Sequence, residues 1–190
     1  MRLFVAVEIS PATVSAALEC IETMRTRVVR LAPQSRITWI TADRLHITLR
    51  FIGHVAEEEH AAAILQVLRS PLDQAPFDLT VAGVGTFPPK GAPRVVWAGV
   101  AGARDRLVAL EEVVSGRLAG VGVPRDARPF SPHLTLARVR EAGGLRSRAL
   151  LEGLGDTVLG VTRVDTITLF ESRLSSQGPR YQPLQRALLT

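Results

Sequence analysis

Two of the four histidines in the chain open the same short pattern. The first stretch, residues 46–49, reads HITL, and the second, residues 133–136, reads HLTL. An internal duplication would explain the echo without any function. However, the flanking sequences do not obviously match, and a duplicated strand has no need of histidine. The repeat therefore marks His46 and His133 as candidate functional residues.

Each pattern has the alternation of a β-strand that is anchored on one face. Residues i and i+2 of a strand point to the same side, so His46 and Thr48 share one face while apolar residues fill the other. His133 and Thr135 repeat this arrangement. Strands hold side chains more rigidly than loops do, so each motif is suited to presenting an imidazole beside a hydroxyl.

Two such histidines suit the opening of a cyclic phosphate by water. One proton must leave the water and another must reach the leaving ribose oxygen, and in-line attack places these events on opposite sides of phosphorus. An unperturbed pKa of ~6.5 allows one histidine to be neutral while its partner is protonated. The hydroxyls of Thr48 and Thr135 can donate to the non-bridging oxygens. The pattern predicts His46 and His133 as an acid and base pair, and leaves open which takes which role.

These motifs resemble the signature of the two-histidine phosphoesterase superfamily. Within it, the chain is similar to the RNA 2′,3′-cyclic phosphodiesterases, also called 2′-5′ RNA ligases. The likeness covers nearly the whole chain and includes Arg2–Ala6, the region of Trp39, Leu49–Gly53, Gly83–Pro88, Pro93–Trp97, Phe130–Arg138 and Ser172–Tyr181.

The resemblance implies both a fold and an activity. The implied fold is α+β, bilobal and pseudo-twofold, with two antiparallel-rich sheets flanking a central cleft and helices outside. The implied activity converts a 2′,3′-cyclic phosphate to a 2′-phosphomonoester. His46 is then the proton donor to the 3′ oxygen, and His133 is the base that accepts a proton from water.

Arg138 resembles the family arginine that follows the second motif and holds phosphate. In an unbroken strand it would face away from His133, so a strand end or a bulge near Ala137 is needed to turn it into the cleft. Arg50 has the parity of His46 and is the alternative, with less support from the family.

The sequence contains no motif for a metal or a cofactor. It has no His-x-x-x-His pair and only one cysteine, Cys20, so we expect neither metal nor cofactor in the reaction. Two other functions stay open: 2′-5′ RNA ligation at the same site, and a non-catalytic module that binds RNA or nucleotides. Without a nucleotide-binding loop, ligation would run on the energy of the cyclic phosphate, and water would compete unless the RNA ends were held together.

The charge of the chain permits a nucleic-acid partner. The formal net charge is +5, and of the 23 basic residues only Lys90 is not arginine. Arginine grips phosphate in a bidentate way, although the coding bias of a GC-rich genome would also produce this composition. We expect RNA ends or nucleotides as partners. Phe4, Phe51 and Tyr181 are candidates for base stacking, but Phe4 and Phe51 are of a kind that more often packs in a core.

Hydrophobic periodicity predicts helices alternating with strands in one domain, residues 1–190. Helices are expected over 11–31, 57–68, 107–121 and, more weakly, 145–154. Strands are expected near the N-terminus and over 36–53, 77–87, 94–100, 134–139 and 158–170, and a loop over 175–179. The N-terminal apolar stretch is too short for a signal peptide, and no run of about 18 apolar residues exists, so we expect neither a signal peptide nor a membrane span. With one cysteine no internal disulfide is possible, and we expect a cytoplasmic protein. We also expect a monomer.

Overall fold

The computed structural model describes residues 1–176 and 178–190, and it confirms the α+β class. The helices are α1 (Pro11–Leu31), the short 3-10 helix η1 (Ala42–Arg44), α2 (Glu58–Val67), α3 (Arg104–Ala119) and α4 (Ser147–Leu151). The strands are β1 (Arg2–Glu8), β2 (Arg36–Trp39), β3 (His46–His54), β4 (Phe77–Phe87), β5 (Val95–Gly102), β6 (His133–Glu141), β7 (Val158–Val164), β8 (Thr166–Ser175) and β9 (Gly178–Leu188).

The strands form a curled antiparallel sheet in two halves. The order is β7-β4-β5-β6-β3-β1-β8-β9, with β2 paired to β6. The halves meet where β3 pairs with β6 at Ile47 and Leu134, the residues that follow the two motif histidines. On either side of this junction the order repeats as a motif strand followed by three antiparallel partners. The sheets of the expected bilobal fold are thus joined at the centre.

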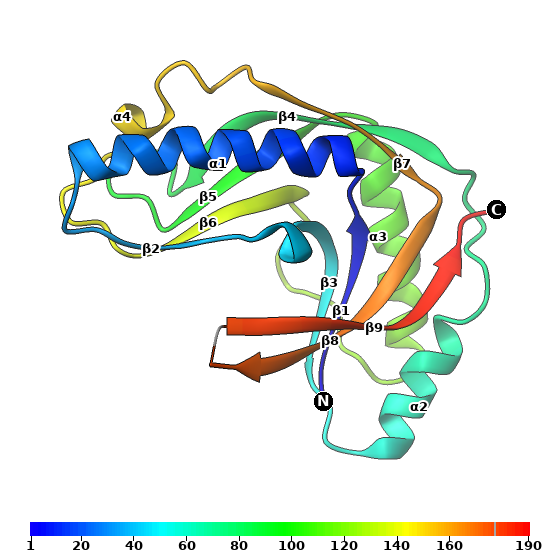
Figure 1. Cartoon of the computed structure of the whole chain (residues 1–190). Helices are drawn as coiled ribbons and strands as arrows, with labels where there is room; N and C mark the ends of the chain where they lie inside the picture. Colours follow the sequence, from blue (N-terminus) through cyan, green and yellow to red (C-terminus); the bar gives the residue numbers. More distant parts are fainter. Residues whose placement is uncertain (177) are drawn as a thin grey trace.

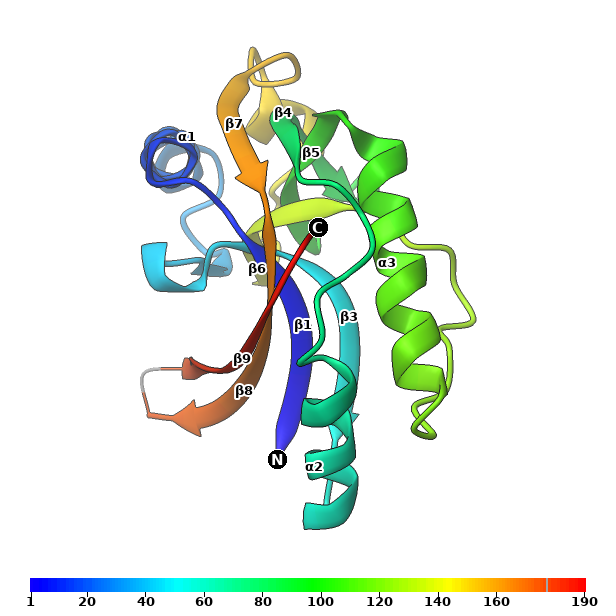
Figure 2. The same ribbon diagram turned by 90° about the vertical axis from the view of Figure 1, so that its right-hand side faces the viewer.

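Each half contributes the long helix that covers the other half. Helix α1 follows β1 but packs against β7, β6 and α4, while α3 follows β5 but packs against β3. Figure 1 shows α1 lying across the half that contains β4 and β7, and Figure 2 shows α3 beside β3 on the other half. This exchange ties the halves together and leaves the other face of the sheet open for a site.

The start of α1 shows how local sequence sets an element. Ser10 is extended and its hydroxyl accepts a hydrogen bond from the Thr13 amide, while Pro11 occupies the first turn, where a missing N–H costs nothing. The buried positions Ala17, Ile21 and Met24 then recur at helical spacing and pack into the main core. The helix therefore begins and faces as its sequence predicts.

The C-terminal tail departs from the prediction. Part of the loop expected over 175–179 belongs to strands, because β8 continues to Ser175 and β9 begins at Gly178; Gln177 lies outside the described residues. Strand β9 was not predicted. It contains Pro179 and Pro183 and lies at the edge of the sheet, where a residue without an amide proton is tolerated.

Among the described residues, no helix is long and apolar enough to cross a membrane.

Candidate active site

The junction of the two halves places the histidine motifs in one cleft. Because β3 and β6 run antiparallel and pair one residue beyond each histidine, His46 and His133 come from opposite halves to the same face. The cleft has a volume of about 1160 Å³. All five residues predicted for the site line it: His46, Thr48, His133, Thr135 and Arg138.

Both imidazoles are held by the main chain two residues before them. His133 donates from Nδ1 to the carbonyl oxygen of Ser131 at 2.7 Å. His46 makes a main-chain hydrogen bond with Arg44, and its Nε2 lies 3.0 Å from Oγ1 of Thr48. In His133, donation from Nδ1 keeps Nε2 free for proton transfer, whereas Nε2 of His46 lies within hydrogen-bond distance of the Thr48 hydroxyl. We had not predicted Arg44 and Ser131 as ring partners, although both occupy the position two before a motif histidine.

A β-bulge turns Arg138 into the cleft. In the pairing of β6 with β5, Thr135 faces Trp97 and Ala137 faces Val96, so Leu136 is an extra residue. Two consecutive residues of β6, Leu136 and Ala137, are consequently buried, and the side-chain alternation shifts by one. The bulge that Arg138 requires is therefore present.

The same irregularity in β3 excludes Arg50 from the cleft. Thr48 pairs with Ala6 and Arg50 with Val5, which makes Leu49 the extra residue. Arg50 points to the covered face, where it is 3% exposed. Its assignment as an alternative phosphate ligand was wrong, because the parity argument assumed an unbroken strand.

Phe51 occupies the place on β3 that Arg138 has on β6, five residues after the histidine. It is 61% exposed and lines the cleft, so it is not a core residue. Phe4, by contrast, is 4% exposed and packs against Phe170 with ring centroids 5.3 Å apart. Of the three aromatic candidates, Phe51 and Tyr181 present themselves to a ligand more openly than Phe4.

His46 is packed among aromatic side chains. The ring centroids of Phe4 and Tyr181 are 5.0 Å and 5.3 Å from that of His46. Burial lowers the pKa of His46 to about 4, helped by the charge of Arg138 and opposed by the main-chain bond to Arg44 and the charge of Glu8. In the unliganded protein this histidine is neutral at pH 7. Burial also raises the pKa of Tyr181, while nearby arginine charge lowers it.

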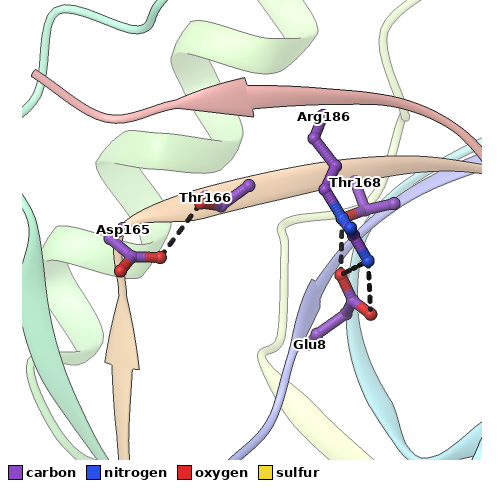
Figure 3. A network of polar contacts seen from close by, with 5 residues as sticks. All are labelled: Glu8, Asp165, Thr166, Thr168 and Arg186. Atoms are coloured by element: carbon purple, nitrogen blue, oxygen red, sulfur yellow. Dashed lines mark hydrogen bonds and ion pairs between the residues drawn. The ribbon is translucent and has the colours of Figure 1, made fainter.

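The Glu8 carboxylate is fixed beside His46. Glu8 pairs with His46 across β1 and β3. Thr168 donates a hydrogen bond to its Oε2 at 2.8 Å, and Arg186 forms an ion pair with it at 3.3 Å (Figure 3). The carboxylate therefore supplies a held negative charge that favours protonated His46.

The surroundings of His133 are different. Phe87 meets its ring edge-on, with centroids 5.6 Å apart, and packs against Trp97 at 5.2 Å. The Trp97 ring lies directly over Gly85, where an added Cβ would come within 2.3 Å of a ring carbon. Because Gly85 has no side chain, the indole can pack against the main chain there, with its plane tilted by 34° from that of the Phe87 ring.

The cleft is rich in arginine. Its lining includes Arg2, Arg44, Arg125, Arg128 and Arg138. Within the part of the chain that the structure describes, none of these five is in an ion pair. Across residues 1–176 and 178–190, no group of three or more His, Cys, Asp or Glu side chains is arranged to hold a metal ion. Three acidic residues, Glu111, Glu112 and Asp126, also line the cleft, but the five arginines outnumber them, so the net charge of the lining suits an anionic ligand.

Comparisons with known proteins assign the chain to a family. Residues 12–175 match the model of the 2′-5′ RNA ligase superfamily. An Aeropyrum pernix protein named RNA 2′,3′-cyclic phosphodiesterase is 39% identical over 75% of this chain and 80% of its own. An Archaeoglobus fulgidus protein of the same name is 32% identical over 97% and 98%.

Solved structures agree. The crystal structure of TT0787 from Thermus thermophilus has a TM-score of 0.76 and 28% identity, covering 100% of this chain and 98% of that one. Escherichia coli LigT complexed with 3′-AMP has a TM-score of 0.68 and 30% identity, with the same coverage. The matched family model, the relatives and the fold together show that this chain belongs to the 2′-5′ RNA ligase superfamily.

Proposed function

We propose that the protein hydrolyses 2′,3′-cyclic phosphate ends of RNA to 2′-phosphomonoesters, without a metal ion, through an acid and base pair of histidines. The observation that carries the proposal is the duplicated arrangement of His46 and His133 in one cleft. Each ring belongs to a central strand and each is held by a main-chain group two residues before it. The names of the relatives support the same substrate.

In this proposal His133 takes a proton from water and His46 gives one to the departing 3′ oxygen. The neutral tautomer of His133 has its Nε2 lone pair free, because Nδ1 donates to Ser131. The two rings come from opposite halves, an arrangement that suits in-line displacement, in which the acid and the base act on opposite sides of phosphorus. Each positioned proton transfer contributes about 10²-fold to 10⁴-fold to the rate.

The pKa of His46 connects substrate binding to catalysis. At about 4 it leaves the donor unprotonated in the unliganded protein at neutral pH. A cyclic phosphate carries one negative charge, and placing that charge beside the ring favours the imidazolium. Binding of the substrate therefore raises the pKa of His46 and prepares it to donate. The fixed Glu8 carboxylate acts in the same direction.

Three further residues complete the proposed grip on phosphate. Arg138 lines the cleft from β6, and its charge reaches both His46 and Tyr181. The hydroxyls of Thr48 and Thr135 share the face of the histidines and can donate to the non-bridging oxygens. Phe51 and Tyr181 offer ring surface to a base.

RNA ligation is a second candidate reaction for the same site. It uses the same two proton transfers, with a ribose hydroxyl in place of water. The family is named after ligation, while the curated relatives are named after phosphodiesterase activity. Because both histidines come from one chain, we propose that a monomer of one domain suffices for either reaction.

A turnover assay in EDTA tests the proposal. We expect a short RNA ending in a 2′,3′-cyclic phosphate to be hydrolysed equally well with and without the chelator. His54→Ala is the matched control for the variants His46→Ala and His133→Ala, since His54 is an exposed histidine at the far end of the same strand as His46. Loss of turnover in EDTA that a divalent ion restores would refute metal independence. No turnover under any condition would refute the hydrolase and favour the ligase or a binding module.

A further inference from the structure

We propose that Arg50 is a positioning residue for His133: it clamps the start of the loop whose end holds the catalytic ring. The two residues lie on different motif strands, and no direct contact between them is needed. The proposal rests on the loop between α3 and β6 and on what fixes its two ends.

The loop has few internal restraints of its own. Residues 124–132 contain no helix or strand. In the described part of the chain, no turn or loop hydrogen bond between main-chain groups involves residues 124–131. A segment without such bonds takes its conformation from side-chain contacts at particular points.

Arg50 supplies the contact at the first end. Its guanidinium donates to the carbonyl oxygen of Pro124 and forms an ion pair with Asp126. The arginine is 3% exposed on the covered face of β3, whereas the Asp126 side chain is 64% exposed. A planar, buried guanidinium with two partners on one loop fixes the loop in both distance and direction.

His133 is attached at the second end. Its Nδ1 donates to the Ser131 carbonyl at 2.7 Å, and this bond selects the tautomer with Nε2 free for the cleft. A shift of the loop moves the Ser131 carbonyl and with it the restraint on the ring. Arg50 thus ties the strand of the first motif to the group that orients the histidine of the second.

The contact of Arg50 with the loop is not repeated in the other half of the molecule, although both halves share the motif strand and its bulge. Arg50 follows the bulge of β3 as Ala137 follows the bulge of β6. Ala137 is fully buried and its methyl group cannot make a polar contact with a loop. The main-chain bond that holds His46 comes instead from Arg44, which belongs to the short helix η1 directly before β3.

The test compares Arg50→Met with Arg117→Met. Arg117 likewise donates to carbonyl oxygens of a loop, those of Ser70 and Pro71, and like Arg50 it does not line the cleft. Among the residues that the structure describes, the loop that it holds contains no hydrogen-bond partner of His46 or His133. Well below the melting temperatures, we expect Arg50→Met to lower kcat about tenfold or more with little change in KM, as when a reacting group is displaced by about 1 Å. Arg117→Met should leave kcat unchanged.

A second readout separates positioning from general damage and does not depend on the proposed function. Nitrogen-15 NMR of the imidazoles should show His133 as the Nδ1-protonated tautomer in the wild type and a mixture in Arg50→Met. The ring of His46, held by Arg44, should keep its signals and serves as the internal control. If the wild type has no turnover, the proposed function fails, while the NMR comparison still decides about the clamp.

Two milder variants guard against a failure of Arg50→Met to fold. Asp126→Asn removes one partner at an exposed position, and Arg50→Lys keeps the charge but loses the fork. Both should lower kcat less than Arg50→Met does, and both should perturb the His133 signals. Unchanged kcat and unchanged His133 signals in a folded Arg50 variant would overturn the proposal, as would equal losses in the Arg50 and Arg117 variants.

Discussion

The two halves of the cleft share a frame but surround their histidines differently. In both halves, the histidine is the first residue of a strand, and its ring is hydrogen-bonded to a main-chain group two residues earlier. In both strands, a β-bulge lies three residues after the histidine. Yet His46 is enclosed by Phe4 and Tyr181, while His133 meets Phe87 at one edge. The repeated backbone therefore determines the positions of the two rings, whereas the different neighbouring side chains give each ring its own environment.

The difference continues beyond the bulges. The position five residues after the histidine is Phe51 in one half and Arg138 in the other. Both side chains line the cleft. We propose that the ring serves a base and the guanidinium a phosphate, so that a nucleotide binds in a single direction across this nearly symmetric scaffold.

The largest expected effect comes from the histidines. Replacing His46 or His133 by alanine should each lower kcat by ~10²-fold or more, because each removes one proton transfer. Since the two rings act in one step, the double variant should be little worse than the weaker single variant. Steady-state kinetics on one cyclic-phosphate RNA measures all three. Turnover that survives in either single variant would break the acid and base pair.

The next effect tests the contrast between Arg138 and Phe51. Arg138→Met should lower kcat/KM by roughly 10-fold to 100-fold, since it removes a charge-assisted hydrogen bond to phosphate, and Arg138→Lys should recover part of the loss. Phe51→Leu should cost only a fewfold in kcat/KM and chiefly change the preference among bases. Parallel kinetics on substrates that differ only in the terminal base measures this. Equal losses in the arginine and phenylalanine variants would remove the assigned division of labour.

A third effect is the pH response of His46. In the unliganded protein its ring should titrate near pH 4, and a bound phosphate analogue should raise that midpoint. Proton NMR of the His46 ring follows both titrations. A midpoint near 6.5 without ligand would show that the aromatic side chains around His46 do not shield its ring from water.

The same pKa predicts a loss of stability in acid. The unfolded chain takes up the His46 proton below pH ~6.5 and the folded protein only near pH 4, so folding weakens as pH falls between these values. The full contribution is on the order of 3 kcal/mol and should be missing in His46→Gln. The difference between the two urea unfolding free energies, measured from pH 7 to pH 4, isolates it from the titrating carboxylates. A constant difference would contradict the lowered pKa.

Local patterns predicted some elements closely and others only coarsely. The strand expected over 36–53 is divided into β2, η1 and β3, and the one expected over 158–170 spans β7 and part of β8. The strand over 77–87 and the helix over 11–31 have the bounds expected from alternation and capping. The edge strand β9 was missed because its prolines and mixed polarity resemble a loop. It enters the sheet through pairing with β8, which depends on the whole fold.

Within the site, the paired motifs were visible in the sequence because each lies in one short strand. The bulge after Thr135 was anticipated only because Arg138 required it, and the matching bulge after Thr48 was not, so Arg50 was assigned to the wrong face. The contact of Tyr181 with His46 was equally hidden, since it joins residues far apart in the chain.

The most direct test of the account is phosphorus NMR on a 2′,3′-cyclic dinucleotide in EDTA, with the wild type and the His46→Ala and His133→Ala variants side by side. We predict that the cyclic resonance is replaced by that of a 2′-phosphomonoester with the wild type and persists with both variants. A 3′-phosphate product would mean that the 2′ oxygen is the leaving group, and it would contradict the proposal that His46 protonates the 3′ oxygen. A cyclic resonance that persists with the wild type, or disappears with either variant, would contradict a two-histidine cyclic phosphodiesterase.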